Sequence, residues 1–294
     1  MLDYHLHLWQ HRDAETPMVL DQLAAYCERA QAQGVVELAL TEHLHRFVQI
    51  GPVVGEFWRR PENEAYLADA MAGYFDHHMR ADLDRYVDLC LEAKRQGLPV
   101  VLGMEVDYYR GQMDAVGELL AQYPFDVLLG SVHWIGNWQF DDVDSLAQMA
   151  EWETREVDAC WDAYTEALEE LAATASCDVL AHPDVIKVAG MRPDHPQEWW
   201  DRIAEAAATS KMAAEVSSAG WRKPAAEAYP APPLLTRFVA KGVPLTTASD
   251  AHRLDHVADR AGDLRTMLDE AGVTHLQGYR NRQPHSVPLV PPAR

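Results

Sequence analysis

Apolar and polar positions alternate along the chain in a repeating order. A short apolar run is followed by a polar loop and then by a longer segment whose apolar residues recur at helical spacing. Short apolar runs bounded by polar loops predict buried strands. The pattern predicts seven of them, at residues 2–7, 35–40, 99–106, 125–132, 178–181, 212–216 and 244–248. Strands that alternate with helices are typical of a parallel α/β sheet.

The same pattern predicts helices at residues 19–33, 81–96, 113–123, 154–173, 198–210, 234–241 and about 255–271. Two aromatic-rich excursions, at about 47–81 and 135–152, are long for connections in a compact domain. Such segments are usually lids or binding loops, so we expect that role here. Residues 273–294 are predicted to be an extended segment that packs on the body. The whole of 1–294 is expected to form one barrel-sized domain.

Reactive side chains recur where the predicted strands end. Six of the seven strands end in candidate metal ligands, and the seventh leads to Arg222 and Lys223. The candidates are His5, His7, His43, Glu105, His133, His182, Asp250 and His252. Any single one of these is more often structural, for example as a cap on the next helix. Structural histidines have no reason to choose the same end of successive strands, so the recurrence favours a metal site.

Charge and cysteine content narrow the class of protein. The formal net charge of −21 repels a nucleic-acid backbone, so we expect no nucleic-acid partner. The four cysteines lie far apart without a Cys-x-x-Cys pair, and no signal peptide or membrane-length apolar run is found. We therefore expect reduced, buried thiols, a cytoplasmic location and no membrane partner.

The strand-end motifs resemble, in order, those of the polymerase-and-histidinol-phosphatase (PHP) metal-dependent phosphoesterases. They are Asp3-Tyr-His-Leu-His7, Thr41-Glu-His43, Gly103-Met-Glu105, Gly130-Ser-Val-His133, Ala181-His182-Pro-Asp184 and Ser249-Asp250-Ala-His252. Within that superfamily, three segments look most similar to the histidinol-phosphatase branch. They are Glu105-Val-Asp-Tyr108, Ser131-Val-His133 and residues 217–223.

The resemblance implies a distorted (β/α)7 TIM-like barrel with a trinuclear metal site at the carboxyl ends of the strands. It assigns one ion to His5, His7, Glu105 and Asp250, and a second to Glu105, His133 and His182. It assigns the third to His43, His252 and a first-loop residue, which is commonly His in the family. This chain has Asp13 there, with His11 as the rival. Because Asp is a competent oxygen ligand, the third site is expected either to bind an ion with a preference for harder metals or to be weakly filled.

The residue types also fit phosphoryl transfer without the family. Two divalent ions can share a hydroxide and clamp the oxygens of an in-line displacement. Imidazole with carboxylate suits Zn, Fe or Mn better than Mg, so two to three such ions are expected. Phosphate binding needs cations as well. Arg222 is the first candidate because its planar fork can take two oxygens, and Lys187 and Arg46 are secondary candidates.

The leaving alkoxide also needs a proton donor. Asp250 and His252 are the catalytic candidates, although each is also a predicted ligand, and His45 lies nearby without an assignment. The resemblance implies hydrolysis of L-histidinol phosphate to L-histidinol and phosphate in histidine biosynthesis. The alternatives are a phosphodiesterase or nucleotide hydrolase, and a catalytically weak metal-binding accessory module. The choice of metal and the oligomeric state are left open.

Overall fold

The computed structural model describes residues 1–10 and 18–289. Seven strands form one parallel sheet in which each strand pairs with the next one along the chain. They are β1 (Leu2–Asp3), β2 (Glu37–Leu40), β3 (Val100–Asp107), β4 (Val127–Ser131), β5 (Val179–Leu180), β6 (Ala213–Ser217) and β7 (Leu245–Ala248). All seven predicted strands are therefore present, several of them shorter than predicted.

The sheet curls until its first and last strands meet. The amide of Tyr4 donates to the carbonyl of Thr247 at 2.9 Å, and the amide of His7 donates to that of Ala251 at 2.7 Å. A parallel bridge also joins Leu6 to Ala251. The strands thus close into a barrel, and the predicted distorted TIM-like architecture is confirmed.

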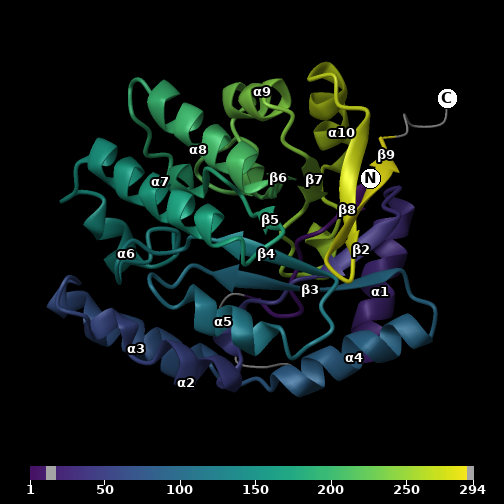
Figure 1. The fold of residues 1–294 in the computed structure, drawn as a ribbon, viewed down its shortest axis with the longest axis horizontal. Helices are drawn as coiled ribbons and strands as arrows, with labels where there is room; N and C mark the ends of the chain where they lie inside the picture. Colours follow the sequence, from purple (N-terminus) through teal and green to yellow (C-terminus); the bar gives the residue numbers. More distant parts are fainter. Residues whose placement is uncertain (11–17, 290–294) are drawn as a thin grey trace.

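Helices surround the strands (Figure 1). The longer helices bury an apolar stripe. On α4, for example, Leu83, Tyr86 and Cys90 are buried at helical spacing, and the Asp82 side chain caps the helix by accepting from the amide of Asp84. The helices are α1 (Leu20–Ala32), α2 (Gly51–Val54), α3 (Ala65–His78), α4 (Leu83–Arg95), α5 (Met113–Leu120), α6 (Leu146–Glu151), α7 (Val157–Thr174), α8 (Gln197–Ser210), α9 (Pro232–Ala240) and α10 (Ala261–Glu270).

The segment 47–81 differs from the irregular loop that was predicted. It contains α2, a 3-10 turn at Phe57–Arg59 and the 14-residue helix α3. Helical spacing of Leu67, Met71 and Phe75 buries one face of α3, and the Phe75 ring lies 4.8 Å from that of Trp58. The aromatic residues that suggested a loop therefore form a packed cluster that holds a helix over the barrel.

The C-terminal segment, predicted to be extended, forms an antiparallel hairpin of two strands, β8 (His275–Arg280) and β9 (Gln283–Pro288). It does pack on the body, as predicted. The Tyr279 hydroxyl donates to the carbonyl of Asp178 at 3.0 Å, and Arg282 Nε lies 2.9 Å from the Asp178 carboxylate. Because Asp178 immediately precedes β5, the hairpin covers the amino ends of the strands and leaves the carboxyl ends for the site.

The start of the last helix and the state of the cysteines were also predicted. The last helix begins at Ala261 rather than near Asp255, because Ala258 and Arg260 adopt positive φ angles that interrupt it. The four cysteines are buried and unpaired, as expected. Within residues 1–10 and 18–289, no helix has both the length and the apolar character that a membrane span requires.

Candidate metal centre and active-site cavity

The predicted ligands meet at the carboxyl ends of the barrel strands. They follow β1, β2, β4, β5 and β7, or, for Glu105, lie near the end of the long strand β3. Every residue of β3 is buried, so Glu105 places a carboxylate in the protein interior. An ionised group in such a place requires charged or hydrogen-bonding partners.

Glu105 is the centre of the cluster. Its Oε2 lies 2.6 Å from Nδ1 of His43 and 3.3 Å from Nε2 of His5. Its Oε1 lies 3.0 Å from Nε2 of His182 and 3.2 Å from Nε2 of His133. We call Glu105 with these four histidines the Glu105 cluster. One carboxylate thus faces imidazoles from four other strand ends.

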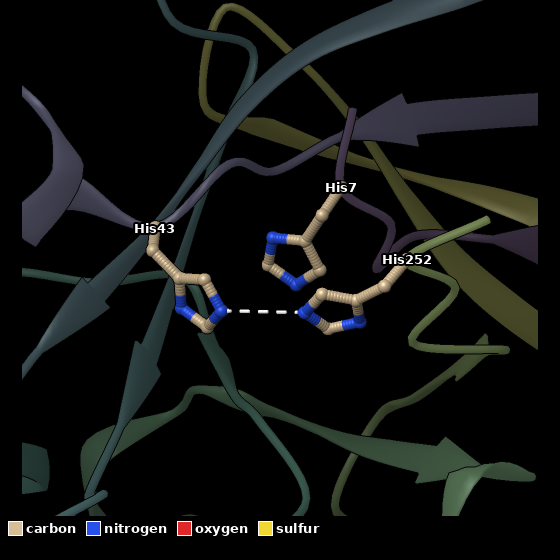
Figure 2. A group of neighbouring side chains, drawn as sticks. All are labelled: His7, His43 and His252. Carbon is tan, nitrogen blue, oxygen red and sulfur yellow. Dashed lines mark hydrogen bonds between the residues drawn. The ribbon is translucent and has the colours of Figure 1, made fainter. Parts of the chain in front are cut away.

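A second group of imidazoles consists of His7, His43 and His252 (Figure 2). It shares His43 with the Glu105 cluster. The rings of His43 and His252 each stack on that of His7, with centroids 4.1 Å apart in both pairs. Nε2 of His43 lies 3.5 Å from Nε2 of His252. On the other side, Nε2 of His7 lies 3.5 Å from Oδ1 of Asp250. His7 is therefore shared between two potential ligand sets.

The donor atoms fit bound metal ions. Nε2 of His5, Nε2 of His7 and Oε2 of Glu105 are buried and make no hydrogen bond within the described part of the chain. Leaving buried polar atoms unsatisfied is costly, and a divalent cation would satisfy all three. The ligand atoms of each of several triads, including His5, Glu105 and His182, lie within 4.8 Å of one another.

Two buried glutamates orient the first two histidines. Oε2 of Glu215 accepts from Nδ1 of His5 at 2.8 Å, and Oε1 of Glu42 lies 3.3 Å from Nδ1 of His7. Each leaves Nε2 of its histidine turned toward the cluster, which is the usual arrangement behind a metal-bound imidazole. Neither role was predicted from the sequence. A lone glutamate inside the otherwise small and apolar strand β6 was the available signal for Glu215.

Asp107 has the same role for two other histidines. Its Oδ1 accepts from Nδ1 of His133 at 2.6 Å, and its Oδ2 accepts from Nδ1 of His45 at 3.0 Å. Nε2 of His45 in turn accepts from the Tyr74 hydroxyl of α3 at 2.9 Å. His45, left unassigned by the sequence, thus connects α3 to the carboxylate that orients His133.

Replacing Asp107 with asparagine is expected to weaken zinc binding about tenfold to a hundredfold, because the orientation of His133 depends on this carboxylate. Competition with a fluorescent zinc chelator would measure the change. Asp114→Asn, which removes an exposed carboxylate from α5, is the matched control and should bind zinc like the parent. Equal affinities for all three proteins would contradict the orienting role.

The mixture of buried charges sets the protonation of the cluster. Burial raises the pKa of Glu105, but His5, His43 and His133 outweigh it and hold the pKa well below the usual range. Burial lowers the pKa of His5, but Glu105 and Glu215 outweigh it and raise the pKa well above the usual range. The carboxylate therefore stays ionised, as a metal ligand must.

Arg222 does not line the cavity above the cluster. Its guanidinium donates to the carbonyls of Ser249, at 2.6 Å, and Asp250, at 3.1 Å, and it pairs with Asp259 at 3.2 Å. These contacts fix the loop that follows β7. The structure thus connects Arg222 to the position of Asp250 and leaves its predicted contact with phosphate untested.

Lys187 and Arg46 are also directed elsewhere. Lys187 is 1% exposed, and its Nζ lies 2.8 Å from both Asp184 and Glu227. Nε of Arg46 lies 3.4 Å from Glu42. Neither side chain lines the cavity, so both predicted phosphate contacts remain predictions without support from the geometry.

A cavity of about 200 Å³ lies above the ligands, and we call it the central cavity. Glu105 and most of the clustered histidines form its floor. Among the described residues that line it, Lys223 is the one lysine or arginine. Asp13 and His11, the two candidates for completing a third metal site, lie outside the described residues.

Comparison with known proteins agrees with this geometry. The family model of the PHP domain matches residues 3–219. The chain belongs to the PHP domain family. The matched region begins within β1, contains every strand from β2 to β6 and includes all the predicted ligands except Asp250 and His252.

One curated relative and two solved structures are similar to this PHP protein. The “Probable histidinol-phosphatase” of Deinococcus radiodurans is 33% identical over 188 residues, which are 64% of this chain and 71% of the relative. A candidate histidinol phosphatase from Listeria monocytogenes has a similar structure, with a TM-score of 0.72, 18% identity and coverage of 90% of this chain and 99% of the other. The histidinol phosphate phosphatase of Lactococcus lactis was solved with zinc, L-histidinol and phosphate. Its structure has a TM-score of 0.64 and 18% identity, and the match covers 97% of this chain and 98% of the other.

Proposed function

We propose that the protein is a metal-dependent phosphomonoesterase that hydrolyses L-histidinol phosphate to L-histidinol and phosphate, a step of histidine biosynthesis. The observation that carries the proposal is the burial of Glu105 among four imidazoles at the floor of a cavity that also contains Lys223. The relative from Deinococcus radiodurans supports the choice of substrate.

We infer that two to three divalent ions bind at the predicted ligands, which are His5, His7, Asp13, His43, Glu105, His133, His182, Asp250 and His252. Zinc is supported by the relative from Lactococcus lactis, and iron and manganese suit the same ligand types. When bound, such ions lower the pKa of water and neutralise the charge of a phosphoryl group.

The chain's own residues would hold the ester over this floor. Lys223 can bind phosphate oxygens through its ammonium group. Asp250 and His252 both line the central cavity, so either can pass a proton to the leaving alkoxide. Tyr229 lines the same cavity and gives it an aromatic wall.

Assays with three esters test the proposal: L-histidinol phosphate, p-nitrophenyl phosphate and bis-p-nitrophenyl phosphate. We expect hydrolysis of both monoesters, with the highest kcat/KM for L-histidinol phosphate. Preferential cleavage of the diester would favour the phosphodiesterase alternative. No turnover with zinc, manganese or iron would favour the accessory module.

Replacing Lys223 with methionine is expected to raise KM for phosphate monoesters about tenfold or more and to change kcat much less, because a charge-assisted hydrogen bond to phosphate is lost. Steady-state kinetics with both monoesters would measure this. Lys211→Met removes an exposed lysine beyond α8 and should leave both parameters unchanged. A normal KM in Lys223→Met would remove Lys223 from phosphate binding.

A further inference from the structure

The central cavity contains groups of both charges. Lys223 reaches it from the segment that follows β6. The segment between β4 and α6 supplies Gln139 and three acidic residues, Asp141, Asp142 and Asp144. Phosphate is repelled by such carboxylates, so this acidic wall needs another explanation within a phosphatase site.

Asp141 lines the cavity without a direct bonding partner. Within residues 1–10 and 18–289, its carboxylate makes no hydrogen bond and no ion pair. Burial raises its pKa to about 6, and Asp142 adds to the shift, while His133 and Lys223 oppose it. A carboxylate in that position would be stabilised by a cation that enters the cavity.

Gln139 gives an independent indication of a ligand. The residue is 5% exposed and lines the cavity, yet its carboxamide makes no hydrogen bond to any described residue. An amide can both donate and accept, so it can bond to a polar group of a ligand in the cavity. Its position therefore fits a ligand whose tail carries a polar group.

We propose that the wall formed by residues 139–144 selects phosphate monoesters that carry an ammonium group next to the ester carbon, with Asp141 binding the ammonium and Gln139 the polar end of the tail. This inference rests on the proposed function and identifies how the site would recognise its substrate. L-histidinol phosphate has both features, since its amine is on the carbon beside the ester methylene and its imidazole ends the tail.

The arrangement of charge explains why such a wall would discriminate. Lys223 and Asp141 line the same cavity, and the part of the chain that the structure describes contains no ion pair between them. A substrate with phosphate and ammonium on adjacent carbons can meet both groups at once. Esters with neutral tails leave Asp141 without a partner, and esters with anionic tails are repelled by Asp142 and Asp144.

The test compares two esters that differ only in the amine: L-histidinol phosphate and its deamino analogue, 3-(imidazol-4-yl)propyl phosphate. We expect the unmodified protein to prefer the amine about tenfold to a hundredfold in kcat/KM, as a charge-assisted hydrogen bond allows. In Asp141→Asn this preference should fall about tenfold, while kcat/KM for the deamino ester and for p-nitrophenyl phosphate stays within about twofold.

Two further variants complete the experiment. Asp88→Asn removes an exposed carboxylate from α4, and it should keep the preference. Gln139→Leu should raise KM for both imidazole esters equally, because each retains the imidazole, and should leave p-nitrophenyl phosphate unaffected. An unchanged preference in Asp141→Asn, or an equal loss with all three esters, would overturn the inference and leave the proposed function standing. Absence of monoesterase activity in the unmodified protein would overturn both.

Discussion

Replacing Glu105 with glutamine is expected to lower kcat/KM for L-histidinol phosphate by about a thousandfold or more. Bound ions contribute several kcal/mol of transition-state stabilisation, and this carboxylate is the group that faces most of their ligands. In the structure its two oxygens lie within 3.3 Å of nitrogens from His5, His43, His133 and His182. An amide has no charge to balance the ions that these nitrogens would bind.

Elemental analysis of the same protein should show fewer ions per chain. Glu118→Gln, which changes an exposed glutamate of α5, serves as the control and should keep both activity and metal content. Circular dichroism would establish that Glu105→Gln is folded. A folded variant with normal metal content and normal turnover would contradict the central role of the carboxylate.

Removing the divalent ions with a chelator is expected to abolish phosphatase activity and to lower Tm, because ions that bind only the folded state stabilise it by mass action. The buried Nε2 atoms of His5 and His7 would then again lack hydrogen-bonding partners. Activity assays and thermal unfolding, before and after adding zinc, manganese or iron, would measure both effects.

The Glu105→Gln variant provides the matched comparison for this experiment. Its Tm should respond much less to added metal than that of the parent, since the shared carboxylate is missing. An equal rise of Tm in both proteins would mean that the stabilising ions bind somewhere other than the Glu105 cluster. Full activity after exhaustive chelation would contradict metal dependence.

The positions of the candidate ligands could be predicted because the fold class fixes where strands end. Parallel strands in a barrel all point toward one mouth, so a histidine that ends a strand is brought to that mouth whatever the distance along the chain. His5 and Glu105 are one hundred residues apart in sequence and 3.3 Å apart in space, between Nε2 and Oε2. The hydrophobic period and the order of the strands were enough to place both residues at this mouth.

The partners of each charged side chain could not be predicted in this way. Arg222 and Lys223 are adjacent, yet the first donates to the backbone of the loop after β7 and the second lines the central cavity. Adjacency on a loop fixes proximity but not direction, because direction depends on local backbone angles and on the groups nearby. Glu215, which orients His5, was missed for a related reason. Its role depends on its contact with that histidine, which comes from a distant part of the chain.

The sequence by itself thus determined the order of the strands and which histidines and carboxylates lie at their ends, since these follow from the hydrophobic period, while the barrel and the metal-site assignment came from the resemblance to the PHP family. Only the tertiary structure decided that 65–78 is a helix over the site, that a hairpin closes the opposite end and that Asp141 and Gln139 face the cavity without partners among the described residues. The physical reason is that periodicity records which side of an element is buried, whereas the contacts of a polar side chain depend on groups that come from distant parts of the chain.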